Sequence, residues 1–303
     1  MRISSQSQYD GYSARIRETQ ARVIETQMRA TDLKTLHRPS DDPTALGTVL
    51  DVRAYKASVE TYRSNLSRGT NLLKGAENAL TELATGVGRG TTLAIAGANS
   101  TVDPASRKAM ATEIDGIRKR LVELGNSRDA DGTYIFAGQK NDAPPFSVNA
   151  TGALAYSGDA NPVLVETDAG ETIAANVDAA AMFRAAYANL TKLRDALEGN
   201  DVAALGDLRL PEMQASKSEV EALRGVVGTK MQTLTARDAS HERRIEDLVG
   251  RASDLEEVDF ASALVDYQQA DQRDRFCHLA QFCGQVCPTS GTEVEPRLFG
   301  PHA

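Results

Sequence analysis

The chain has 303 residues, of which 41% are hydrophobic, 25% charged and 5% aromatic, a composition typical of folded rather than disordered proteins. The formal net charge of −8 argues against a surface that follows nucleic-acid phosphates. No stretch approaches the roughly 20 apolar residues of a membrane-spanning helix, so we expect neither nucleic acid nor a membrane as partner.

The spacing of apolar residues from Tyr12 to Leu33 predicts a weak amphipathic helix. Apolar and small residues alternate in steps of four and three, the spacing of a coiled-coil seam. The apolar members of this seam are Tyr12, Ile16, Val23 and Leu33. Thr and Ala fill other seam positions, so we expect the helix to fold against neighbours rather than alone. The segment also lacks the apolar core of a cleavable secretory signal, which predicts a cytoplasmic protein or export through an uncleaved N-terminus.

A stronger seam follows Asp42, whose carboxylate can cap free helix amides, and Pro43, which suits the first helical position. Asp41 and Asp42 could instead form a metal or acid–base pair, but a cap explains the whole Ser-Asp-Asp-Pro string. The seam runs for more than five heptads and includes Val52, Val59, Leu66, Leu73 and Leu80.

Glycines and a second cap signal are expected to end this helix. Gly86, Gly88 and Gly90 follow a helix instead of a strand and lack the ending of a phosphate loop, so we interpret them as a hinge. Asp103 before Pro104 again predicts a cap, and an apolar series with four-three spacing follows it to Leu124.

Short apolar segments between turn residues predict a small β-rich insert over residues 134–178. The expected strands are Tyr134–Phe136, which follows an Asp-Gly turn, and Leu154–Tyr156, Val163–Val165 and Ile173–Val177. Helical spacing then returns from Phe183 to Leu197.

The last long helix is expected to begin at Pro211. Its seam includes Val227, Leu234, Ile245, Leu248 and Leu255. Asp238 and His241 interrupt the seam, where polar residues cost stability but can specify register. We interpret His241, like His37, as a surface or seam-edge histidine.

Together these elements predict a mainly α fold, a long antiparallel coiled-coil helical rod with a small β-rich insert. The expected divisions are 1–43, 44–133, 134–178, 179–257 and 258–303. The chain shows no pattern of catalytic, metal-binding or cofactor-binding residues. Cys277, Cys283 and Cys287, with His278, could form a zinc or redox site, but their spacing lacks the usual close cysteine pairs. We therefore expect a structural protein without a cofactor, not an enzyme.

Several short motifs occur in an order and at spacings that are typical of a known protein family. They are Met1–Ser4, Arg38–Pro43, Ala94–Asn99 with Asp103–Arg107 and Glu113-Ile114, Gly132–Gly138 and, more weakly, Ser253–Asp259. This series resembles the flagellin superfamily and, within it, the hook-associated protein 3 family, over about residues 1–267. Phe260, Leu264 and Tyr267 continue the four-three spacing of the seam. From residue 271 the sequence departs, because Asp271, Asp274 and His278 occupy the next positions, where the seam should stay apolar. A frame-shifted or degenerate tail and a naturally diverged tail are the two interpretations.

The resemblance implies a structural subunit that joins the hook-associated junction to the flagellin filament, exported by the flagellar secretion system. It implies hook-associated protein 1, flagellin, a ring of further copies and a cytoplasmic export chaperone as partners. A short flagellin that forms the filament itself is the first alternative. A cytoplasmic Cys/His metal-binding helical protein is an alternative of another class.

Overall fold

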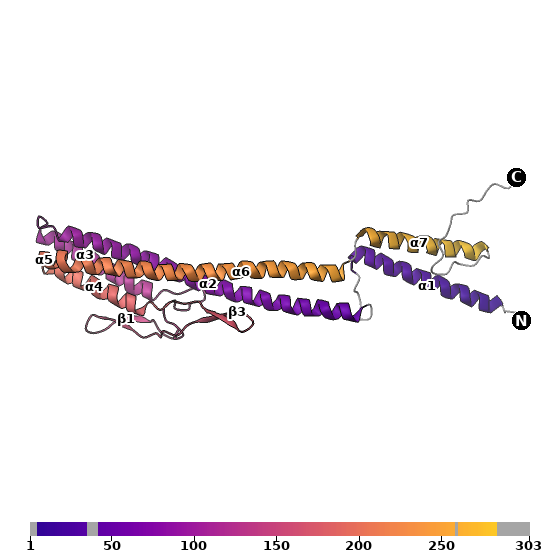
Figure 1. Ribbon diagram of the computed structural model, residues 1–303, viewed down its shortest axis with the longest axis horizontal. Helices are drawn as coiled ribbons and strands as arrows, with labels where there is room; N and C mark the ends of the chain where they lie inside the picture. Colours follow the sequence, from indigo (N-terminus) through magenta and orange to yellow (C-terminus); the bar gives the residue numbers. More distant parts are fainter. Residues whose placement is uncertain (1–4, 35–41, 258–259, 284–303) are drawn as a thin grey trace. The chain divides into compact units, whose positions relative to one another are not determined.

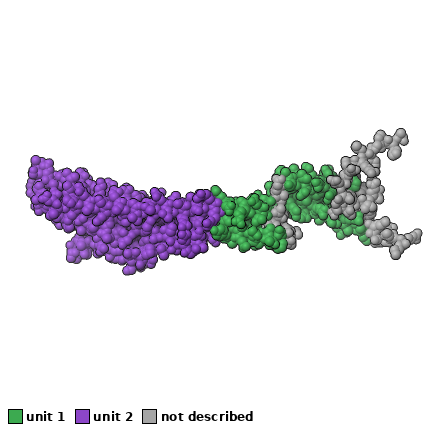
Figure 2. Space-filling model, viewed as in Figure 1, with its two compact units in different colours: residues 1–56, 246–303 green, residues 57–245 purple. Residues whose placement is uncertain are grey.

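The computed structural model describes residues 5–34, 42–257 and 260–283, with only the backbone described for residues 5–9, 12 and 277–283. The chain divides into two compact units, one of residues 1–56 with 246–303 and the other of residues 57–245 (Figure 2). We refer to them as unit 1 and unit 2 and describe each by itself. The helices are α1 (Ser5–Asp32), α2 (Pro43–Gly97), α3 (Pro104–Gly125), α4 (Ala180–Glu198), α5 (Val202–Ala204), the π-helical η1 (Leu205–Arg209), α6 (Leu210–Glu256) and α7 (Phe260–Cys283).

Four short strands form two separate antiparallel hairpins in unit 2 (Figure 1). The strands are β1 (Phe146–Val148), β2 (Leu154–Tyr156), β3 (Leu164–Asp168) and β4 (Glu171–Ala174). The mainly helical fold with long packed helices and a small β component is therefore confirmed. Strands β2, β3 and β4 lie at or near three of the four expected strands. The sequence analysis did not predict β1.

Unit 2 is built on two long helices that run antiparallel. Arg63 of α2 pairs with Asp238 of α6 at 2.8 Å, and Glu77 of α2 pairs with Arg224 of α6 at the same distance. Residue numbers of the paired positions therefore rise along α2 while they fall along α6, as they do in antiparallel helices. Helices α3 and α4 pack beside one end of this pair, so that part of unit 2 is a four-helix bundle (Figure 1).

Buried apolar side chains recur every seven residues on both long helices. In α2 the series within unit 2 is Val59, Leu66, Leu73, Leu80 and Val87, and in α6 it is Met213, Val220, Val227 and Leu234. Each of these side chains is at most 1% exposed. This strict heptad spacing keeps one side of each helix facing the other, as in coiled coils.

The expected hinge at Gly86–Gly90 is wrong, because α2 continues without a break to Gly97. A Cβ atom added at Gly90 would lie 2.9 Å from Met213 Cε and 3.1 Å from Leu190 Cδ2. At Gly86 it would lie 3.3 Å from Ile117 Cγ2. These two glycines allow neighbouring helices to approach α2 closely within the bundle, and the packing supplies the stability that glycine lacks.

Tyr134–Phe136, expected as a strand, forms turns with one isolated bridge between Arg128 and Tyr134. All three side chains are buried, whereas a surface strand would alternate buried and exposed positions. The rings of Phe136 and Phe183 lie 5.1 Å apart. Aromatic packing on α4 therefore holds this segment in an irregular conformation.

The β3–β4 hairpin is attached to both long helices. Ala175, which follows β4, would contact a Cβ atom at Gly69 of α2 at 3.1 Å. Lys230 of α6 donates hydrogen bonds to the carbonyls of Ala174 (3.1 Å) and Asn176 (2.6 Å). Burial lowers the pKa of the Lys230 ammonium, because it disfavours the charged form.

In unit 1, α1 packs along α7 (Figure 1). The start of α2 and the end of α6 also belong to this unit and are joined by an ion pair between Arg53 and Glu256 at 2.6 Å. Leu33 ends α1 with a positive φ of 53°, and Lys34 forms a backbone bridge with Glu257.

The expected phase of the seam in α7 is wrong at two positions. Phe260 and Leu264 are 57% and 38% exposed, whereas Ala263 and Ala270 are buried. On α1, apolar and short polar side chains alternate at the half-buried positions, which include Ile16, Thr19, Val23 and Thr26. Tyr267 and Asp271 are half-buried, as the expected seam positions imply.

Candidate assembly surfaces and functional site

The predicted seam residues occupy different environments in the two units. In unit 2, Val59, Leu66, Leu73, Leu80, Val227 and Leu234 are buried, and Ile245 is half-buried. In unit 1, Val52 and Leu248 are buried, and Ile16, Val23, Leu33 and Leu255 are half-buried. The side chain of Tyr12 lies outside the described part of the structure. Interior packing therefore accounts for the unit 2 seam, while the unit 1 seam is more exposed.

The two predicted capping residues lie at helix starts with their carboxylates on free amides. Asp42 Oδ1 accepts hydrogen bonds from the backbone amides of Thr44 and Ala45, both at 2.9 Å. Asp103 Oδ1 accepts from the Ser106 amide at 2.9 Å. Hydrogen bonds from the Ser106 hydroxyl and amide lower the pKa of Asp103. The contribution of each cap to stability remains a prediction.

Replacing Asp42 with asparagine is expected to leave the free energy of unfolding nearly unchanged, because an asparagine side chain also accepts from helix amides. Replacement with alanine is expected to cost about 1 kcal/mol. Urea unfolding followed by circular dichroism would measure both. Equal losses for the two variants would show that the negative charge matters and that the cap account is insufficient.

The sequence predicted that His241 lies on the surface or at the edge of the seam. This prediction is wrong, because the His241 side chain is buried, with 2% of it exposed. It occupies the next seven-residue slot after Leu234. Its Nε2 atom donates a hydrogen bond to the carbonyl of Thr167 in β3 at 2.7 Å. This bond satisfies a polar side chain inside the seam and connects α6 to the hairpin, 74 residues away in the chain.

Asp238, the other polar residue on the α6 seam, is partly exposed and held by Arg63. The hydrogen bonds from the Arg63 guanidinium lower the pKa of the Asp238 carboxyl, and burial opposes this shift. A depressed carboxyl pKa contributes stability at neutral pH, and that stability is lost as the pH falls through the folded-state pKa.

The structure does not test the remaining candidates for metal binding or catalysis, because their side chains lie outside its described part. Within the residues that the structure describes, no three His, Cys, Asp or Glu side chains converge in a way that suits a metal ion. The side chains of Cys277, His278 and Cys283 lie outside the described part, as do Asp41, His37 and Cys287. None of the described helices combines the length and apolarity that a membrane crossing requires.

Sequence reasoning missed Arg107, a buried cation at the end of the bundle. Its guanidinium donates to the carbonyls of Gly97 and Asn99, both at 2.8 Å, and to Asn200 Oδ1 at 2.6 Å. The carbonyl of Gly97 is at the last residue of α2, and Asn200 lies just after α4. One side chain therefore joins three helices where their chain reverses.

Several large apolar side chains are exposed on the α1–α7 pair. They are Ile24 and Met28 on α1 and Phe260, Leu264, Val265 and Phe276 on α7, all between 38% and 57% exposed. We call this set the terminal apolar face. A concentration of exposed apolar residues on one helix pair is typical of a protein interaction surface.

Known proteins match this chain over most of its length. A family model for the bacterial flagellin N-terminal helical region matches residues 3–141. Flagellar hook-associated protein 3 of Salmonella typhimurium is 27% identical over 298 residues, covering 89% of this chain and 93% of its own length.

Solved structures share the fold. FlgL of Bacillus cereus has a TM-score of 0.59 and 22% identity, with coverage of 67% of this chain and 99% of that chain. The flagellar junction protein FlgL of Legionella pneumophila has a TM-score of 0.59 and 11% identity, with coverage of 69% of this chain and 100% of that chain.

The comparisons agree with the motifs in the sequence and with the helical fold. The matched region of the flagellin model contains α1, α2 and α3, and the alignment with the Salmonella protein extends beyond that region to 89% of the chain. The chain therefore carries a region similar to the bacterial flagellin N-terminal helical region and is similar over nearly its whole length to flagellar hook-associated protein 3.

Proposed function

We propose that this chain forms a ring of copies that contacts hook-associated protein 1 on one side and flagellin on the other. Similarity to flagellar hook-associated protein 3 supports a role as a structural subunit of the extracellular flagellum at the hook–filament junction. The observation that carries the proposed contacts is the terminal apolar face. Six large apolar side chains remain exposed on this helix pair, whereas Ala263 and Ala270 of α7 are buried.

The character of α1 and α7 supports assembly from a weakly folded state. The α1 seam uses Thr and Ala at several positions, and its Ile16 and Val23 remain half-buried. Burial against neighbouring subunits would complete the removal of these side chains from water. A cytoplasmic chaperone that covers the terminal apolar face before export fits the same chemistry.

Replacing Ile24 and Phe260 together with serine is expected to prevent stable incorporation at the junction. Each large apolar side chain contributes about 1.5 kcal/mol or more when buried, so two losses weaken association roughly 100-fold. The measurement is the number of flagella that carry immunogold label at the junction, together with the amount of protein exported to the medium.

Val148→Ser provides a matched control, because Val148 is 49% exposed but lies on β1 in unit 2. This control should assemble normally. Normal junction labelling of the Ile24→Ser/Phe260→Ser protein would contradict the proposed contacts. Reduced export with unchanged labelling per exported molecule would assign the face to export instead of assembly.

A further inference from the structure

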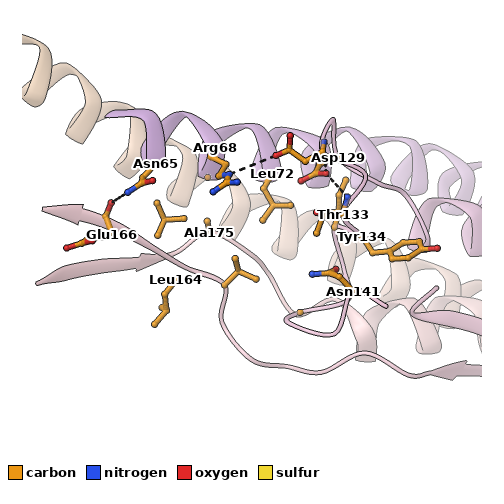
Figure 3. Close-up of a pocket in the computed structure, with 16 residues that line it drawn as sticks. Asn65, Arg68, Leu72, Asp129, Thr133, Tyr134, Asn141, Leu164, Glu166 and Ala175 are labelled. Carbon is orange, nitrogen blue, oxygen red and sulfur yellow. Dashed lines mark hydrogen bonds and ion pairs between the residues drawn. The ribbon is translucent and has the colours of Figure 1, made fainter. Parts of the chain in front are cut away.

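Unit 2 contains a pocket between α2, the loop before β1 and the start of β3 (Figure 3). Its volume is about 360 Å³, near the lower end of the range of about 300–1,000 Å³ for ligand sites. Asn65, Arg68 and Leu72 of α2 form one wall, and Thr133 and Tyr134 of the loop form another. The third wall is the chain from Val163 to Glu166.

The third wall is the outer edge of strand β3. The carbonyl of Val163 accepts from the Ala175 amide at 2.9 Å, on the side where β4 pairs. Because hydrogen-bonding direction alternates along an antiparallel strand, the backbone groups of Leu164 and Glu166 face the opposite edge. Asn65 Nδ2 donates to the Glu166 carbonyl at 3.3 Å, which agrees with this direction (Figure 3).

The hairpin is held firmly enough to keep this edge in place. At Gly69 of α2, an added Cβ atom would meet Ala175 Cβ at 3.1 Å and Val165 Cγ2 at 3.4 Å. The inner face of the hairpin is thus packed directly on α2, while the Leu164 side chain points away from the helix and is 56% exposed (Figure 3). An edge strand fixed beside a pocket is a template for an added strand.

The charges around the pocket favour a basic ligand. Asp129, Asp131 and Glu166 contribute three carboxylates to its lining, against one guanidinium from Arg68. Arg68 Nε lies 4.0 Å from Asp131 Oδ2 with both side chains mostly exposed, so this pair neutralises the acidic rim only weakly. Leu72 and Val165 supply apolar surface between the charged groups.

We propose that this pocket binds an extended, basic peptide segment that pairs with the outer edge of β3. The amide and carbonyl of Leu164 and the amide of Glu166 form main-chain hydrogen bonds with the peptide. Alternate peptide side chains enter the pocket, where an apolar residue meets Leu72 and a lysine or arginine meets Asp129 or Asp131. This site is separate from the terminal apolar face, and its binding does not depend on filament assembly.

The test uses a fluorescein-labelled peptide, acetyl-Val-Thr-Lys-Thr-Arg-Thr-amide, and the full-length protein. Its valine, lysine and arginine lie on the same face of an extended chain. Fluorescence anisotropy should show saturable binding below about 1 mM. A peptide with glutamates in place of the two basic residues should bind more weakly. Two further peptides carry N-methyl groups on alternate amides, one on the odd-numbered residues and the other on the even-numbered residues. Only one of the two should lose binding, because only one set of amides faces β3.

Two protein variants examine the site itself. Leu164→Pro removes an outer-edge amide without removing a β3–β4 hydrogen bond, and should weaken binding about fivefold to tenfold. Asp131→Lys should weaken binding of the basic peptide and strengthen binding of the glutamate peptide. Asp131 is largely exposed, so this second variant remains informative if proline disturbs the hairpin.

Val148→Lys, on the edge of the other hairpin, is the matched control and should bind like the unaltered protein. Absence of saturable binding to the basic peptide would overturn the proposal. Equal binding of the two N-methylated peptides would overturn the proposed strand pairing. Equal binding of the basic and the glutamate peptide to the Asp131→Lys protein would overturn the proposed role of the acidic rim.

Discussion

Replacing Arg107 with alanine is expected to lower the free energy of unfolding by about 3–5 kcal/mol, because hydrogen bonds to a charged group contribute about 1.5–3 kcal/mol each. The side chain is 2% exposed and donates to the carbonyls of Gly97 and Asn99 and to Asn200. Alanine leaves those acceptors unpaired inside the protein and removes the packing of the aliphatic stem.

Arg107→Lys separates charge from geometry. A lysine ammonium keeps the charge but cannot reach three acceptors that the planar guanidinium spans, so we expect about half of the alanine effect. Urea unfolding of the full-length protein by circular dichroism is the measurement. Arg89→Ala is the control, because Arg89 pairs with Glu113 on an exposed surface and should change stability little. Arg107→Ala with the stability of this control would contradict the role of Arg107.

Replacing Gly138 with alanine is expected to destabilise the protein by about 3 kcal/mol, the sum of left-handed backbone strain and overpacking. Gly138 has a φ of +70°, and an added Cβ atom would overlap both the carboxylate and the backbone carbonyl of Asp159. Asp159 cannot move away easily. Its carboxylate accepts from the Gln139 amide at 2.8 Å, and its own amide donates to the Ala137 carbonyl at 3.0 Å.

Gly152→Ala is the matched control for Gly138→Ala. Gly152 has a similar φ of +77°, but an added Cβ atom would meet nothing within 4 Å. It should therefore show the strain alone, about 1 kcal/mol. Thermal unfolding of the two variants measures the difference. Equal losses would show that the close approach at Asp159 contributes nothing.

The helices could be predicted because their core positions repeat locally. Every seventh residue of α2 from Val52 to Val87 is buried, and that spacing is visible without knowledge of any partner. The cap geometry at Asp42 and Asp103 likewise depends on neighbours within three residues. Features determined by short-range spacing are accessible to sequence reasoning.

Features that depend on distant contacts were missed or misassigned. His241 is buried because Thr167, far away in the chain, accepts its hydrogen bond. At Gly86 and Gly90 of α2, residues of α3, α4 and α6 pack close to the glycine backbone. The three acceptors of Arg107 likewise come together only after α2, α3 and α4 have packed. No local pattern contains these contacts.

The proposed function requires the chain to lie at the hook–filament junction. The most direct measurement is electron microscopy of intact flagella carrying gold-labelled antibody against the chain. We predict label confined to a narrow band at the filament base of each flagellum. Label distributed along the filament, as for a flagellin, or label confined to the cytoplasm would contradict this location.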